Sequence, residues 1–232
     1  PRLFREGPGG SRHAERLVRD AMYSIFLIGN IASGKSTAAK YLEAHGARRI
    51  DLDQVAKSLY TPGSTIVSEI ADTFGWDVLD SQGSVRYGLL AQRAFESPES
   101  VSKLNSIVHP ALKEYVGQVL LPSNCCSTLA PSFELTVIEV SAPMGFEDVF
   151  TLADEVLAVT APLAVRRQRA CERGMSQEDF DARASLQPDE EELRSLADAV
   201  IDNTLADDSL YAQLDAWAAS RGIHLEGNGY GV

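Results

Sequence analysis

A glycine-rich segment that ends in lysine and serine is the part of the sequence best suited to hold phosphate. The segment GNIASGKS, residues 29–36, fits the pattern G-x-x-x-x-G-K-[ST] of a phosphate-binding loop (P-loop). Its glycines permit a tight turn in which N–H groups face phosphate oxygens. Lys35 can then reach the β- and γ-phosphates of a nucleotide, and Ser36 can bind Mg²⁺. The expected nucleotide contacts are Gly29, Ala32, Ser33, Gly34, Lys35, Ser36 and Thr37.

Two aspartates one residue apart follow the P-loop. Asp51 and Asp53 are expected to end a second strand, where positions i and i+2 point to the same face. Ligands of open parallel sheets lie beyond the carboxyl ends of the strands, so both carboxylates should face the γ-phosphate. One could accept the proton of an attacking hydroxyl while the other holds a water of the Mg²⁺ shell. Alternatively, one of them caps a helix that starts near Gln54, and the spacing favours neither interpretation.

Three arginines recur at helical spacing in the segment VRRQRACERGMS. Arg166, Arg169 and Arg173 stand at i, i+3 and i+7, which is one face of a helix. By itself such a row is usually a solvated surface balanced by nearby acids. Guanidinium groups also suit phosphate oxygens, and with a P-loop upstream we favour a lid that closes over the phosphates.

Hydrophobic patterning predicts the elements that position these residues. A β-rich run (YSIFLIG), the glycine loop, a helical segment (KSTAAKYLEAHG) and a second strand (ARRIDL) follow one another. This order predicts an α/β fold, a P-loop NTPase-type parallel sheet with helices on both faces. Further strands are expected in ELTVIEVS, DEVLAVTAP and AVID, and a closing helix in DSLYAQLDAWAAS.

The stretch from about 54 to 121 shows helical segments without a convincing strand, and a loop is expected at 122–133. A helical block inserted into an α/β core, and a charged helical segment nearer the C-terminus, are the natural interpretation. The predicted organisation is a core at 22–60, 134–161 and 197–222, an insert at 61–133, a lid at 162–196, and tails at 1–21 and 223–232.

Charge and composition exclude some classes of partner. The 21 Lys and Arg against 33 Asp and Glu give a net charge of −12, which argues against broad contact with nucleic acid. The apolar run YSIFLIG is far too short to span a membrane. Cys125, Cys126 and Cys171 form no disulfide framework or metal spacing, which indicates a reducing, cytoplasmic setting.

The ordered set of motifs resembles the dephospho-coenzyme A kinase family over roughly residues 23–218. After the P-loop and the D-x-D come RYGLLAQRAF and LNSIVHP in the helical block, then PMGFE at 143–147. Arg169 and Arg173 match the family's R-x-x-x-R, and Gln187 with ADAVIDN, ending at Asn203, matches its last motif. The combination is more specific than the P-loop alone.

The resemblance implies an enzyme that uses ATP and Mg²⁺ to phosphorylate the 3′-hydroxyl of dephospho-CoA. Asp53 would be the general base, with Asp51 beside it near the metal and the acceptor. Lys35, Arg169 and Arg173 would stabilise the transferring phosphoryl group. The acceptor would lie against the insert, and ATP would place its adenine end at Asn203. The residues implied on the acceptor side are Arg86 and His109; the oligomeric state stays open.

The chain departs from the family pattern at several positions. Asn30 and Ala32 stand where glycines are usual, and Ala32 fits only if its backbone does not need a positive φ. Met144 and Gly145 replace two leucines in the PMGFE turn. Ser141 stands where an acid is frequent in the family. The absence of that acid would weaken metal coordination unless Asp51 compensates.

Two other functions compete with this one. The loop GNIASGKS also looks like that of deoxyribonucleoside kinases, although the E-R-S segment usual in that group is missing. A regulatory module that binds ATP without turnover would accommodate Ser141 and the altered turn. The presence of Lys35, Ser36 and Asp53 argues against it, because a module without catalysis needs no base beside its P-loop.

Overall fold

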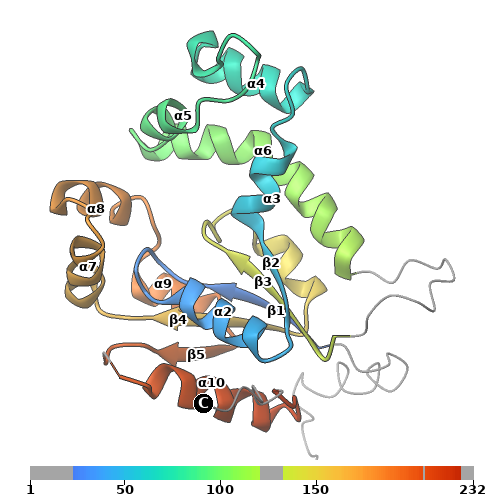
Figure 1. Ribbon diagram of the computed structural model, residues 1–232, viewed down its shortest axis with the longest axis vertical. Coiled ribbons are helices and arrows are strands. Elements are labelled where there is room, and N and C mark those ends of the chain that lie inside the picture. Colours follow the sequence, from blue (N-terminus) through green and yellow to red (C-terminus); the bar gives the residue numbers. More distant parts are fainter. Residues whose placement is uncertain (1–22, 121–132, 206, 226–232) are drawn as a thin grey trace, which may run out of the picture.

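The structure is a computed structural model that describes residues 23–120, 133–205 and 207–225. Its centre is a parallel five-stranded sheet in the order β2-β3-β1-β4-β5, with helices on both faces (Figure 1). The predicted α/β class is confirmed. The strands are β1 (Tyr23–Ile28), β2 (Arg48–Asp51), β3 (Leu135–Val140), β4 (Glu155–Thr160) and β5 (Ala199–Asp202).

The alternation of side chains along the strands divides the core into two layers. Along β1, Ile25 and Leu27 face one layer, whereas Phe26 and Ile28 face the other. The first layer is covered by α2 (Lys35–Ala44) and α10 (Ser209–Ser220), through Leu42 and others. The opposite layer is covered by α6 (Pro98–Leu120), η3 (Glu147–Leu152) and α9 (Glu190–Ser195).

Within the helical stretch after β2, residues 65–94 stand apart from the sheet at the top of Figure 1, whereas Leu52 and the C-terminal half of α6 pack against the sheet. The part that stands apart has its own buried cluster, which includes Val67, Ile70 and Phe74. One isolated bridge, between Leu79 and Val85, is the strand-like pairing in it, so the expectation of helices without a strand agrees with the structure. Besides α6, the elements of the whole helical stretch are α3 (Leu52–Leu59), α4 (Thr65–Phe74), η2 (Trp76–Val78) and α5 (Tyr87–Ala94).

The segment expected to form a lid contains three helices with different surroundings. Helices α7 (Leu163–Glu172) and α8 (Gln177–Ala184) project to the left of the sheet in Figure 1. Helix α9 instead lies on the sheet, where Leu193 is buried in the core. Any lid movement is therefore expected of α7 and α8 rather than of α9.

No helix in the described ranges is long and apolar enough to cross a membrane. Cys171 is exposed and unpaired, whereas Cys125 and Cys126 lie outside the described residues, as does most of the loop expected at 122–133.

Candidate active site

The P-loop connects β1 to α2, as its sequence predicts, and its two pattern glycines are sterically required. A Cβ on Gly29 would lie 2.7 Å from Ser33 Oγ and from the carbonyl oxygen of Val159. Gly34 has φ +102° at the N-cap of α2, and a Cβ there would lie 2.1 Å from Asn203 Nδ2. The loop thus turns as tightly as a phosphate cradle needs.

The rest of the loop is held by residues from the C-terminal third of the chain. The Asn30 side chain donates to the Pro188 carbonyl over 2.8 Å, which gives this departure from glycine a structural role. The Ile31 N–H donates to the side chain of Gln187 over 2.8 Å. The Asn203 amide donates to the Ser33 carbonyl over 2.7 Å. The loop is therefore preorganised by side chains as well as by its glycines.

Ala32 is the exception to the expected backbone conformation. Its φ is +59°, and it is the one non-glycine residue with positive φ in the described ranges. The backbone does need the left-handed conformation here, and alanine adopts it at a cost of roughly 1–2 kcal/mol. The expectation that Ala32 would fit only without a positive φ is not met.

Ala32→Gly is expected to raise the free energy of unfolding by about 0.5–1 kcal/mol. Glycine removes the left-handed strain, and its greater freedom in the unfolded chain offsets part of the gain. Urea unfolding of the two proteins measures the difference. A variant less stable than the wild type would contradict the assignment of strain to this position.

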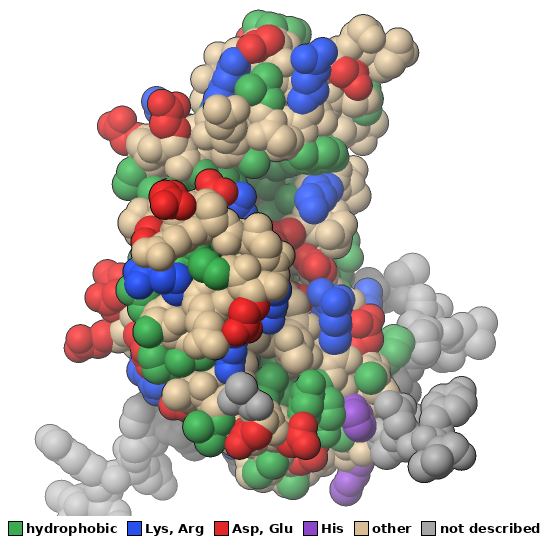
Figure 2. Space-filling model, turned by 60° about the vertical axis from the view of Figure 1, so that its left-hand side comes forward, with side chains coloured by type: hydrophobic (Ala, Val, Ile, Leu, Met, Phe, Trp, Pro, Cys, Tyr) green, Lys and Arg blue, Asp and Glu red, His purple; other side chains and the backbone are tan. Residues whose placement is uncertain are grey.

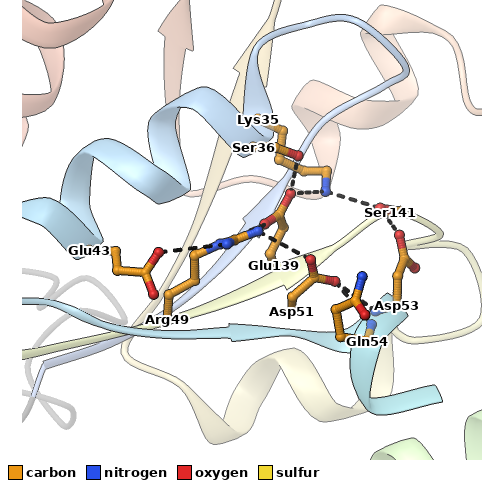
Figure 3. Close-up of polar contacts among 9 residues, drawn as sticks. All are labelled: Lys35, Ser36, Glu43, Arg49, Asp51, Asp53, Gln54, Glu139 and Ser141. Atoms are coloured by element: carbon orange, nitrogen blue, oxygen red, sulfur yellow. Dashed lines mark hydrogen bonds and ion pairs between the residues drawn. The ribbon is translucent and has the colours of Figure 1, made fainter. Parts of the chain in front are cut away.

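Behind the loop, Glu139 of β3 joins the P-loop to β2 (Figure 3). Lys35 Nζ donates to Glu139 Oε1 over 2.8 Å, and the Ser36 hydroxyl donates to the same oxygen. On the other side, Arg49 of β2 binds Glu139 Oε2 over 2.7 Å and Asp51 Oδ2 over 3.1 Å. Glu139 is 3% exposed and Lys35 7% by their side chains, so this ion pair is buried.

Sequence reasoning did not single out Glu139. Burial would raise the pKa of its carboxyl, but the charge of Lys35 and hydrogen bonds from Lys35, Ser36 and Arg49 outweigh it and lower the pKa to about 2. Glu139 is therefore ionised at neutral pH. The signal for it was an acid inside a fully buried strand, LTVIEV, whose other residues are apolar except for Thr136.

The two aspartates do not share a strand face, and the prediction that both end β2 is wrong. Strand β2 ends at Asp51, and Asp53 lies in the first turn of α3. The Asp51 carboxylate accepts the N–H groups of Asp53 and Gln54 over 3.0 and 3.2 Å, as an N-cap does. The capping alternative therefore holds for Asp51, although the helix starts at Leu52.

The Asp53 carboxylate nevertheless lies close to the P-loop lysine. Ser141, the residue after β3, accepts a hydrogen bond from Lys35 Nζ over 3.0 Å. Its hydroxyl donates to Asp53 Oδ2 over 2.9 Å. Lys35, Ser141 and Asp53 thus form one hydrogen-bonded line at the carboxyl ends of the strands (Figure 3).

The three arginines predicted to line one helix face have different surroundings and do not form one free row. Arg166 is buried and donates to the carbonyls of Ala161 and Ile31, and burial lowers its pKa. Arg169 donates to the carbonyls of Asn203 and Leu205 over 2.8 and 3.0 Å.

Arg173 follows α7 as its C-cap, and the described chain gives its side chain no hydrogen-bond or ion-pair partner. Of the three guanidinium groups, that of Arg173 is consequently the one available to a ligand.

In the described chain, the two residues expected on the acceptor side make no hydrogen bond or ion pair with the P-loop. His109 of α6 is 9% exposed, and its Nδ1 lies 3.3 Å from the Gly145 carbonyl of the PMGFE turn. Desolvation by burial is the largest cause of the lowered pKa of His109. Arg86 is the exposed N-cap of α5. Figure 2 shows a recess between the helices at the top and the rest of the molecule, with hydrophobic side chains in its depth.

Comparison with known proteins gives the family. The family model described as dephospho-CoA kinase matches residues 23–208. The dephospho-CoA kinase of Corynebacterium diphtheriae is 38% identical over 191 residues, covering 82% of this chain and 92% of that protein. The chain belongs to the dephospho-CoA kinase family.

Other relatives agree with this. The dephospho-CoA kinase of Aquifex aeolicus is 33% identical over 193 residues, covering 83% of this chain and 94% of that protein. The crystal structure of TT1252 from Thermus thermophilus has a TM-score of 0.65 and 29% identity, and the match covers 87% of this chain and 98% of that one.

A kinase of this family uses ATP. The side-chain oxygens beside the P-loop are the candidate ligands for a Mg²⁺ ion. No group of three His, Cys, Asp or Glu side chains suited to a metal occurs among the described residues. Mg²⁺ at a kinase site is typically bound by one or two protein oxygens together with phosphates and waters. The Ser36 hydroxyl and the Glu139 carboxylate, already in contact, are such a pair, and they fit the ion.

Proposed function

We propose that this chain transfers the γ-phosphoryl group of ATP to the 3′-hydroxyl of dephospho-CoA, which gives coenzyme A and ADP. Membership of the family supports the substrate. The observation that carries the mechanism is the hydrogen-bonded line from Lys35 through Ser141 to Asp53, which brings a carboxylate next to the lysine that would hold the phosphates.

In this reaction Asp53 would act as the general base. Its carboxylate would accept the proton of the 3′-hydroxyl while the ribose oxygen bonds to the γ-phosphorus and the bond to ADP breaks. The exposed position of Asp53 in the first turn of α3 suits this role, since an acceptor can reach its carboxylate from the solvent. Asp51, occupied as a cap and by Arg49, would support this helix start rather than react.

Positive groups would stabilise the charge on the transferring phosphoryl group. Lys35 has a third N–H beyond those used by Glu139 and Ser141, and it would bind the phosphates. Ser36 and Glu139 would hold Mg²⁺, which neutralises phosphate charge when bound.

Helices α7 and α8 would form the lid and bring arginines to the phosphates. Arg173 has a free side chain in the described structure and would be the first to contact the phosphates. Arg169 would give up its hydrogen bond to the Asn203 carbonyl and donate to a phosphate oxygen instead. Closure would also exclude water, which competes with the acceptor hydroxyl. Asn203 is buried on Ser33, so it would affect the nucleotide through the loop that it holds.

The acceptor would bind the insert, residues 61–133, with Arg86 and His109 contributing on the acceptor side of the site. A positive guanidinium suits the diphosphate of dephospho-CoA, while the buried His109 would fix the PMGFE turn through Gly145. A cytoplasmic location and an absence of nucleic-acid partners stay predictions from cysteine content and charge.

The test is an acceptor panel. ADP release is measured with ATP and Mg²⁺ in the presence of dephospho-CoA, of each deoxyribonucleoside, or of no acceptor. Turnover that requires dephospho-CoA, with a product phosphorylated at the 3′-position, is the expected result. Turnover with deoxyribonucleosides alone would show that a deoxyribonucleoside, and not dephospho-CoA, is the acceptor. ATP binding without turnover would indicate a regulatory module.

A further inference from the structure

We propose that Ser141 is a positioning residue: it orients the Asp53 carboxylate and couples it to the P-loop lysine. The inference rests on the proposed function of Asp53, but it concerns a residue with no assigned role.

The direction of the two hydrogen bonds follows from chemistry. A lysine ammonium group can only donate, so the Ser141 hydroxyl must accept from Lys35 Nζ. Its own proton is then directed to the other neighbour, Asp53 Oδ2, at 2.9 Å. The Lys35 contact thereby fixes a hydroxyl that would otherwise rotate, and it makes Ser141 a donor to Asp53.

Asp53 needs such a partner because little else orients its side chain. The residue is exposed, and its backbone N–H is engaged by Asp51. In the described part of the chain, Ser141 alone donates a hydrogen bond to its carboxylate. The bond engages Oδ2 and leaves Oδ1 free to accept a proton from an incoming hydroxyl.

The line is compatible with a bound nucleotide. Lys35 uses one N–H for Glu139 and one for Ser141, and its third remains for a phosphate oxygen. Ser141 directly follows β3, the strand between β1 and β2, so its position is fixed by the sheet. The Lys35 ammonium group thus binds the phosphates and, through Ser141, also aligns the base.

Threonine at this position would keep the hydroxyl that accepts from Lys35 and donates to Asp53. Alanine would remove both hydrogen bonds. Comparing Ser141→Ala with Ser141→Thr therefore isolates the effect of the hydroxyl.

The experiment measures kcat and KM for ATP and dephospho-CoA. Ser141→Ala is expected to lower kcat about 10- to 100-fold, with both KM values within about twofold, because alignment rather than binding is lost. Ser141→Thr, which keeps the hydroxyl, should recover most of the rate. Ser106→Ala, which removes an exposed hydroxyl bonded to the Lys103 carbonyl, is the matched control and should match the wild type.

A double mutant tests whether Ser141 acts through Asp53. In the Asp53→Asn background, Ser141→Ala is expected to lower the residual rate less than about threefold, since the residue that it positions is already gone. Full additivity, or an unchanged kcat in Ser141→Ala alone, would overturn the inference.

Crystal structures of the wild type and Ser141→Ala provide a readout that does not depend on turnover. The Asp53 side chain is expected in one conformer in the wild type and in a different or mixed conformer in the variant. An unchanged conformer in the variant would overturn the positioning role. A wild type without turnover on dephospho-CoA would reject the proposed function, while this comparison would still decide the inference.

Discussion

Asp53→Asn is expected to lower kcat for acceptor-dependent ADP formation about 10²- to 10⁴-fold, the range for removal of a general base. Asparagine has the shape of aspartate and can still accept the Ser141 hydrogen bond through its amide oxygen. It cannot take the proton of the acceptor hydroxyl. ATP binding should change little, because the P-loop is unaltered and Lys35 keeps its contact with Glu139.

The measurement is steady-state kinetics with dephospho-CoA, together with ATP affinity by calorimetry. Asp72→Asn, an exposed aspartate on α4, is the matched control and should retain the wild-type rate. A kcat for Asp53→Asn within about threefold of wild type would show that another group, or the solvent, removes the proton. A loss of ATP affinity equal to the loss of rate would show that Asp53 acts in nucleotide binding.

Much of the fold could be predicted because local patterns and global topology agree. The segment AVID is β5 itself, and the strand–loop–helix order around the P-loop is as its sequence indicates. Short apolar runs bounded by glycine and helical segments leave few arrangements other than a parallel sheet. The alternation of Ile25, Phe26, Leu27 and Ile28 between two layers follows from the same pattern.

The two aspartates were misplaced for a local reason. The prediction that β2 continues through Asp53 treated both aspartates as strand residues because they stand two positions apart. The Asp51 side chain instead accepts the N–H groups of the next turn and starts α3 directly. An aspartate followed by Leu52 and a helical run is a cap signal, and it should have taken precedence over the strand.

The partners of Glu139 and of the arginines could not be predicted because they come from tertiary structure. Glu139 reaches Lys35 and Arg49 only because β3 lies between β1 and β2, a strand order that sequence spacing does not contain. Arg166 and Arg169 have the helical spacing expected of them. Their hydrogen bonds to the carbonyls of Ile31 and Asn203, however, depend on where α7 docks.

Glu139→Gln is the variant expected to affect both stability and activity. Glutamine preserves the shape but leaves Lys35 and Arg49 without their shared counter-charge, and breaking a buried ion pair costs about 3–5 kcal/mol. If Glu139 supports Mg²⁺ together with Ser36, the Mg²⁺ concentration for half-maximal rate should also rise about 10- to 100-fold. Urea unfolding and a Mg²⁺ titration of kcat measure the two effects.

Glu155→Gln is the control that separates them. Glu155 is also a buried strand glutamate paired with an arginine, Arg221 at 2.7 Å, but it lies at the opposite end of its strand from the P-loop side. Its variant should lose stability and keep both kcat and the Mg²⁺ dependence. Equal loss of rate in the two variants, compared where both are folded, would mean that the rate falls only because of general destabilisation.

The pH dependence of stability tests the ionisation of Glu139 directly. Its folded-state pKa of about 2 lies below the ordinary value of 4.5, so the charged form stabilises the fold. That contribution is complete above pH 4.5 and is lost as the pH falls toward 2. The difference in unfolding free energy between the wild type and Glu139→Gln should therefore be constant from pH 7 to about 5 and shrink at lower pH. A difference that stays the same down to about pH 3 would show that the variant loses packing rather than charge, because only the charged interaction titrates.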